Sequence, residues 1–197
     1  VCCLRRSGVL AKELDSRIHV FSMDKGSGDD PGLPLRLGQR IRGRFDVVHT
    51  HSSKAGILGR VAARLAGTPI VVHTLHSLVF GEHATPAQNA LYLSLKRACA
   101  PLTTQFISVC DATKNGAIEK HIGRPEQHCT IYSGFHIEPF LRVRDEITVA
   151  EAKRRVGLSA EHLVVGKVAR LFPQKGHDHF LEAARTIAAR EPRARFL

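Results

Sequence analysis

Two histidines stand one residue apart at the end of a short apolar run, in the stretch HTHSSKAGILGR over residues 49–60. Because side chains alternate along a strand, His49 and His51 share one face of it. Another two, His73 and His76, stand where the next apolar run ends. Ligands bind an open α/β sheet at the carboxyl ends of its strands, so the four imidazoles are candidates for a ligand site.

Several interpretations of these imidazoles stay open. A metal site would use His49 and His51, but Ser-Ser-Lys follows them, which supplies no carboxylate and places a lysine beside the cation. A structural role, with hydrogen bonds inside loops, is the second interpretation. The third is a polar ligand site, in which neutral imidazoles donate and accept hydrogen bonds near neutral pH.

A second group of candidates lies in GKVARLFPQKGHDHFLEAA, residues 166–184. Arg170 ends a predicted strand, Lys175 and Gly176 end a short loop, and an amphipathic helix follows. A helix N-terminus already favours anions, so two cations beside it predict a phosphate or diphosphate site. An ordinary basic loop is the alternative.

The elements that position these residues alternate regularly. β-rich runs are predicted at 18–23, 46–50, 69–75, 104–109, 128–132 and 163–171. Between them, helices are predicted from Ser53 to Gly67, from a capping box at Thr85, from a cap at Asp111, and from a capping box of Thr148 with Glu151. The alternation predicts an α/β fold in which a parallel sheet has helices on both faces.

The composition limits the function classes. A net charge of +11 favours an anionic partner, and five cysteines without a C-x-x-C pair indicate neither a disulfide framework nor a zinc ribbon. Arg36, Arg40 and Arg44 form a basic stripe, either a solvated helix face or a contact with anionic lipid. With neither a long apolar run nor signal-peptide features, we expect a cytoplasmic protein, with peripheral contact at the inner face of the membrane left open.

Common cofactor motifs are missing from the sequence. It contains no G-x-x-x-x-G-K-[ST], no G-x-G-x-x-G and no H-E-x-x-H, so the P-loop, standard dinucleotide-binding and zincin interpretations lose their main support. Nucleic acid is not an expected partner either. Its binding would need exposed aromatic side chains among the cations. The chain has no Trp, and its nine Phe and two Tyr lie mostly within apolar runs.

Four stretches follow one another along the chain in this order: FDVVHTHSSKAGILGRVAARLAGTPIVVHTLHSLVFGEH, FISVCDATKNGAI, IYSGFHIEPF and VARLFPQKGHDHFLEAA. Together they resemble the retaining nucleotide-sugar glycosyltransferases of family 4. The resemblance implies the GT-B fold, two Rossmann-like domains facing a cleft. Small residues, Ala169, Ser77 and Ser133, replace the family's usual Gly, Gly and Asn.

The resemblance also implies roles for single residues. Arg170 and Lys175, with Gly176, would bind the donor diphosphate, His51 would be the catalytic residue that contacts the transferred sugar, and His76 would bind substrate. The reaction would move a hexosyl group from a nucleoside-diphosphate sugar to a glycan or lipid-linked acceptor with retention of configuration. No metal or cofactor is expected, because the donor itself is a substrate.

We expect an N-terminal domain over 1–140, a linker and connecting helix over 141–162, and the start of a C-terminal donor domain over 163–197. Both ends look cut, so a Gly-rich loop and an E-x7-E pair would lie outside the sequence. A GT-B sugar-nucleotide epimerase is the nearest alternative function. A metal-dependent hydrolase using His49 and His51 is the more distant one.

Overall fold

A computed structural model describes residues 1–3, 9–23, 30–78 and 85–197 of the chain. They form two compact units, Val1–Ser133 and Gly134–Leu197, and each is described here by itself. The sequence placed the first boundary at residue 140. The division into an N-terminal domain, a linker with a connecting helix, and a C-terminal donor domain stays a prediction.

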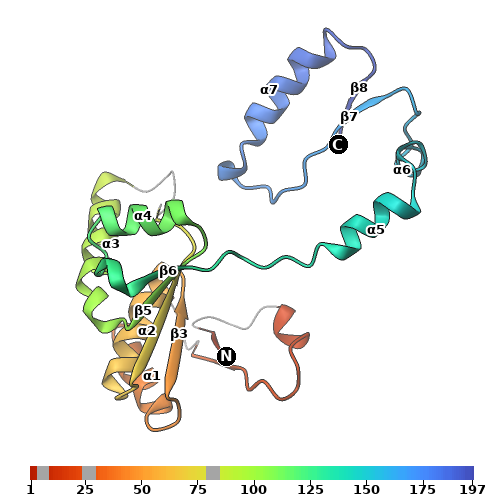
Figure 1. Ribbon diagram of the computed structural model, residues 1–197. Helices are drawn as coiled ribbons and strands as arrows, with labels where there is room; N and C mark the ends of the chain where they lie inside the picture. Colours follow the sequence, from red (N-terminus) through yellow and green to blue (C-terminus); the bar gives the residue numbers. More distant parts are fainter. Residues whose placement is uncertain (4–8, 24–29, 79–84) are drawn as a thin grey trace. The chain divides into compact units, whose positions relative to one another are not determined.

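The first unit is built on four parallel strands, in the order β3-β4-β5-β6 (Figure 1). In this sheet Thr50 lies opposite His73, and His73 lies opposite Phe106. A separate parallel pair, β1 and β2, precedes it in the chain. The elements of this unit are β1 (Cys2–Cys3), η1 (Val9–Lys12), β2 (Phe21–Ser22), α1 (Leu33–Ile41), β3 (Val47–His51), α2 (Ser53–Leu65), β4 (Ile70–Leu75), α3 (Pro86–Ala98), η2 (Ala100–Leu102), β5 (Gln105–Ser108), α4 (Asp111–Glu119), η3 (Pro125–Gln127) and β6 (His128–Thr130). The predicted parallel α/β fold is confirmed.

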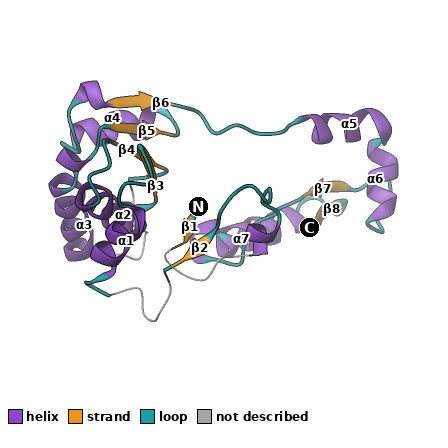
Figure 2. Cartoon of the chain, turned by 90° about the horizontal axis from the view of Figure 1, so that it is seen from below, coloured by secondary structure: helices purple, strands orange, loops and turns teal. Residues whose placement is uncertain are grey.

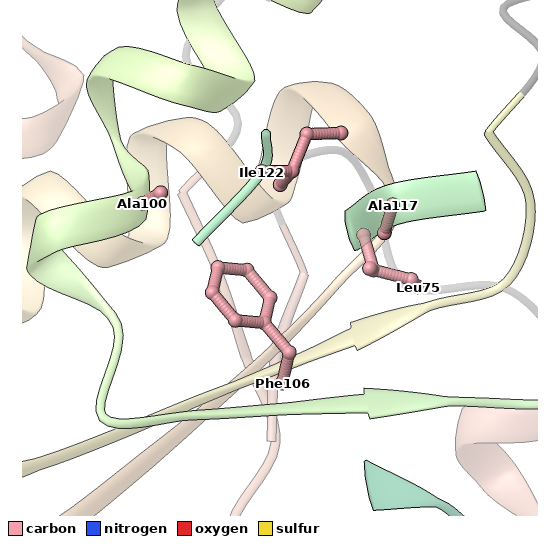
Figure 3. Close-up of a cluster of buried hydrophobic side chains, with 5 residues drawn as sticks. All are labelled: Leu75, Ala100, Phe106, Ala117 and Ile122. Atoms are coloured by element: carbon pink, nitrogen blue, oxygen red, sulfur yellow. The ribbon is translucent and has the colours of Figure 1, made fainter. Parts of the chain in front are cut away.

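The core of this unit lies under the helices. Phe106 of β5 is fully buried, and Figure 3 shows its ring among the side chains that close around it. These neighbours are Leu75, Ala100, Ala117 and Ile122. A second cluster joins α1 to α2 through Leu37, Ile41, Ala62 and Ala66. Val48 of β3 packs against this second cluster, which thereby fixes α2 over the strand that ends in His51.

Helix α1 has the predicted apolar and basic faces, but it ends at Ile41, so Arg44 of the predicted stripe lies beyond it. Leu33, Leu37 and Ile41 are buried, whereas Arg36 and Arg40 are exposed. Arg36 forms an ion pair with Asp30, and the guanidinium of Arg40 lies 4.5 Å from the centre of the Phe21 ring. Nowhere in the described ranges is there a helix of the length and apolarity that spanning a membrane requires.

The helix starts agree with the sequence in most places. Thr85 and Gln88 form the predicted capping box at the start of α3, and Thr148 accepts a hydrogen bond from the Glu151 N–H. The cap predicted at Asp111 is wrong, because Cys110 is the N-cap residue of α4. Thr130 and Tyr132, which lie where β6 ends, hold the Asp111 carboxylate with hydrogen bonds of 2.6 and 2.8 Å.

The second unit contains α5 (Glu138–Glu146), α6 (Val149–Arg155), β7 (Leu163–Val165), η4 (Pro173–Lys175), α7 (His177–Ala188) and β8 (Ala194–Phe196). Strands β7 and β8 pair in parallel, and α7 leads from one to the other (Figure 2). The strand predicted at 163–171 ends early, at Val165. The region expected as a linker and connecting helix begins at residue 141, inside α5, which has Glu138 in its first turn and a proline at its start.

Candidate functional site

Three imidazoles gather where β3 and β4 end. His49 and His51 lie on one face of β3, with ring centres 4.3 Å apart. The Nδ1 atom of His51 lies 3.1 Å from Nε2 of His76, and Nε2 of His49 lies 2.7 Å from the Thr74 hydroxyl. One nitrogen of the His51–His76 contact must donate while the other accepts, so the pair holds a single proton between its two facing atoms.

The surroundings of these histidines favour their neutral form. Partial burial lowers the pKa of His49 and of His51, and the neighbouring imidazoles lower both further. Neutral imidazoles donate and accept hydrogen bonds rather than acting as fixed cations. This chemistry suits the binding of an uncharged polar ligand.

The structure places His73 apart from the other three. Its side chain points to the opposite face of the sheet, where it is only 2% exposed beneath α2. Its Nδ1 atom forms a 2.9 Å hydrogen bond with the Thr50 hydroxyl, and its ring faces Gly56. The expectation of four imidazoles at one edge is therefore wrong for His73. Strand alternation turns it inward, whereas His76 lies just beyond the end of β4.

Buried cations surround His73. Arg60, only 1% exposed, donates hydrogen bonds to the Gly56 and Cys99 carbonyl oxygens and to the Thr103 hydroxyl. Burial lowers the pKa of His73 to about 3, and the charges of Arg60 and Lys96 contribute to the shift. His73 is thus a neutral structural residue of the core.

The chain is expected to lose stability in mild acid because of His73. The unfolded chain takes up a proton near pH 6.5, the folded chain only near pH 3, so stability present above pH 6.5 falls as the pH drops toward 3. At pH 5 the loss is about 2 kcal/mol. Urea unfolding at pH 7 and pH 5 measures it. His73→Asn should remove this part of the pH dependence, and an unchanged dependence would contradict the assignment.

A cavity of about 160 Å³ opens beside the histidine cluster. It is lined by the start of α2, the end of β4 and one residue of α3, namely Ser52, Ser53, His73, Thr74, Leu75, His76, Ser77 and Lys96. Lys96 is only 2% exposed. The sequence did not single out Lys96, because a lysine in the last turn of a helix is ordinarily a solvated residue that complements the helix dipole.

The basic loop of the second unit surrounds the start of α7. Gly176 is the N-cap residue of α7 in a left-handed conformation with φ of 60°, which glycine adopts without strain. His177 binds the Arg170 carbonyl oxygen through Nε2 at 2.7 Å, and Lys167 donates to the carbonyl oxygens of Lys175 and Gly176. These bonds hold the backbone of the loop and leave the exposed Arg170 and Lys175 side chains available to a ligand.

The predicted site residues therefore fall into two groups. His51 and His76 meet in the first unit, whereas Arg170, Lys175 and Gly176 flank one helix start in the second. Within the residues that the structure describes, no three or more His, Cys, Asp or Glu side chains are grouped to hold a metal ion.

Comparison with known proteins gives the following matches. Residues 1–138 match the family model Glycosyltransferase Family 4. An Escherichia coli protein named UDP-Gal:alpha-D-GlcNAc-diphosphoundecaprenol alpha-1,3-galactosyltransferase is 38% identical over 73% of the chain and 37% of its own length. A D-inositol 3-phosphate glycosyltransferase of Thermobispora bispora is 28% identical over 78% of the chain and 36% of its own length.

A solved structure agrees with the fold. The glycosyltransferase from Rickettsia africae ESF-5 superposes with a TM-score of 0.65 at 17% identity, over 97% of the chain and 57% of that protein. The chain spans little more than a third of the length of the two relatives above, 37% and 36%.

Proposed function

Because the chain belongs to glycosyltransferase family 4, we propose that it is part of an enzyme that transfers a hexosyl group from a nucleoside-diphosphate sugar. The family match over residues 1–138 is the observation that carries this proposal. The acceptor is a glycan or a lipid-linked molecule, and the anomeric configuration is retained. A GT-B epimerase finds less support, since the relatives named above are glycosyltransferases.

The second unit binds the donor in this proposal. As the bond between sugar and diphosphate breaks, negative charge grows on the departing phosphate oxygens. Arg170 precedes the turn Pro173–Lys175 that enters α7, and Lys175 is the last residue of that turn. The first N–H groups of the helix also point outward there. Charge stabilisation of this kind is commonly the largest part of catalysis.

The first unit contacts the transferred sugar through His51, with His76 as its hydrogen-bonded partner. The 3.1 Å contact orients the His51 ring, so that its other nitrogen can meet a sugar hydroxyl. His49 stays beside them through its bond with Thr74 and supports the cluster. In this mechanism the histidines bind and orient the sugar, and none of them acts as the nucleophile.

The acceptor in this proposal carries a phosphate or diphosphate group. The names of both relatives describe such acceptors, one a diphosphate-linked lipid and the other an inositol phosphate. A lipid-linked acceptor places the enzyme in the cytoplasm, at the inner face of the membrane. The exposed arginines of α1 are suited to anionic lipid.

Membrane contact through α1 is expected to depend on charge. The protein should sediment with phosphatidylglycerol vesicles at low salt and stay in the supernatant at high salt. Arg40→Glu should weaken the recovery several-fold, because Arg40, unlike Arg36, forms no ion pair with a carboxylate among the described residues. Equal sedimentation with neutral phosphatidylcholine vesicles would contradict a charge-driven contact.

The proposed reaction is tested by measuring the nucleoside diphosphate that the full-length protein forms from a nucleotide sugar. Release from a nucleotide sugar should require the acceptor, and EDTA should leave the rate unchanged, because Arg170 and Lys175 supply the positive charge. A new sugar nucleotide formed from the donor alone would identify an epimerase instead. Complete loss of activity with EDTA, restored by a divalent cation, would contradict the role given to the two cations.

A further inference from the structure

A polar and aromatic cluster lies where β5 and β6 end, at the same edge of the first sheet as the histidines. This Tyr132 cluster consists of Asp111, Lys114, Thr130 and Tyr132. All four residues belong to the first unit, Val1–Ser133. Because ligands bind a parallel sheet at the carboxyl ends of its strands, the cluster stands where a substrate contact is expected.

The Asp111 carboxylate holds the cluster together. It accepts hydrogen bonds of 2.6 Å from the Thr130 hydroxyl and 2.8 Å from the Tyr132 phenol, and Lys114 Nζ lies 3.0 Å from it. The bonds from Thr130, Tyr132 and Lys114 lower the pKa of Asp111 to about 2, so the group stays ionised at neutral pH. An ionised carboxylate has about four acceptor positions. The three described donors therefore leave a position for a ligand hydroxyl.

The aromatic ring of the cluster is exposed but held in place. Tyr132 is 66% exposed, while its phenol is bonded to Asp111 and the backbone N–H of Ile131, its neighbour, donates to the Ser108 carbonyl at 2.9 Å. The bond to Asp111 also raises the pKa of Tyr132, so the phenol keeps its proton. A side chain already fixed in one orientation loses little freedom when a ligand covers it. The ring is thus prepared for contact with a ligand.

The chemistry of the exposed groups selects the kind of ligand. The side chains of Asp111 and Lys114 are 54% and 30% exposed, and their opposite charges cancel, so the cluster favours an uncharged ligand. A pyranose ring is uncharged and carries hydroxyl groups around its rim for a carboxylate and an ammonium group. Its C–H face is apolar and fits against an aromatic ring such as that of Tyr132.

The sheet register places the cluster beside the histidine pair along one edge. Leu75, the last residue of β4, lies opposite Ser108, which lies opposite Thr130. The ends of β4, β5 and β6 are therefore level, with His76 directly after β4 and Tyr132 two residues after β6. Strands β4 and β6 are two strand spacings apart, about 10 Å. A sugar at the histidine pair thus leaves room on this edge for another ring at Tyr132.

We propose that Tyr132 and Asp111 bind a pyranose ring of the acceptor, with the C–H face of the sugar on the tyrosine ring and a sugar hydroxyl donating to the carboxylate. The assignment of this ring to the acceptor rests on the proposed function. Asp111 has a second role in the site, because its bond to the phenol positions the Tyr132 ring.

Saturation-transfer NMR of the full-length protein tests the contact without turnover. The probes are the methyl α-pyranosides of glucose, galactose, mannose and N-acetylglucosamine. Saturation of the aromatic protons of the protein should reach the ring protons of at least one of them. Tyr132→Ala should weaken its binding about tenfold, because the apolar contact is lost, whereas Tyr132→Phe keeps the ring and should weaken it less. Both variants should fold, since the side chain is exposed.

Phe45→Ala is the matched control. Phe45 is also an exposed aromatic residue, but it precedes β3 and so lies at the opposite edge of the sheet. This variant should bind the pyranoside as the wild type does. Binding of none of the probes, or equal binding by the wild type and Tyr132→Ala, would overturn the proposal.

Steady-state kinetics of the same variants separates the acceptor from the donor. Tyr132→Ala and Asp111→Asn should raise the KM for the acceptor about tenfold and leave the KM for the nucleotide sugar unchanged. A raised KM for the nucleotide sugar alone would overturn the assignment to the acceptor. If the pyranoside binds through Tyr132 but no sugar is transferred, the proposed function fails and the sugar site stands. If transfer occurs with an unchanged acceptor KM in Tyr132→Ala, the sugar site fails and the proposed function stands.

Discussion

Full-length protein with Arg170→Ala is expected to turn over its nucleotide-sugar donor about 10²- to 10³-fold more slowly than the wild type. The side chain is exposed, and its guanidinium lies 5.9 Å from the centre of the Phe172 ring. The bond that holds the loop uses the backbone carbonyl of Arg170, which alanine keeps. The loss should therefore appear in kcat and not in folding.

Steady-state kinetics with Arg185→Ala as the control measures this loss. Arg185 is an exposed arginine in the last turn of α7, at the other end of the helix from Gly176. It should leave kcat/KM within about twofold of the wild type. Donor turnover by Arg170→Ala at the wild-type rate would mean that the departing diphosphate is stabilised elsewhere.

The largest expected effect on stability comes from Gly56→Ala in α2. A Cβ atom at this position would lie 2.3 Å from Cε1 of His73 and 2.9 Å from its Nδ1. The ring cannot move aside, because it is 2% exposed and hydrogen-bonded to Thr50. Helix α2 would have to lift from the sheet, at a cost of about 3 kcal/mol or more in the free energy of unfolding.

Gly116→Ala in α4 is the matched control for that variant. Among the described residues its Cβ would meet only the terminal Cδ1 methyl of Leu78, at 2.7 Å, and a leucine side chain can turn away. The higher helix propensity of alanine then makes this change nearly neutral or slightly stabilising. Urea unfolding compares the two, and His73→Ala should partly rescue Gly56→Ala by removing the ring. A stable Gly56→Ala protein would contradict the close packing of α2 on His73.

The histidine cluster could be predicted in part from the sequence. The spacing of His49 and His51 places them on one face, because strand alternation is a local rule. The same rule sends His73 to the other face, where the glycine at position 56 makes room for its ring. The contact of His76 with His51 depends instead on the register that pairs His51 with Thr74. That register is set by the packing of whole strands.

The cavity could not be predicted, because the sequence does not distinguish Lys96, the buried lysine of its wall, from an exposed lysine. Lys96 belongs to the last turn of α3, where basic residues commonly remain in water. Its burial depends on where α3 packs within the first unit. The start of α5 was not predicted either. Phe140 and Leu141 are 68% and 55% exposed, so this helix does not bury an apolar face of the kind that sequence patterns detect.

The anomeric configuration of the transferred sugar tests the central claim most directly. NMR of the product made by the full-length protein from an α-linked nucleotide sugar gives this configuration through the coupling constant of the anomeric proton. We predict an α-linkage in the product, formed only when an acceptor is present. A β-linked product, or a sugar left on the nucleotide in altered form, would contradict the assignment as a retaining glycosyltransferase.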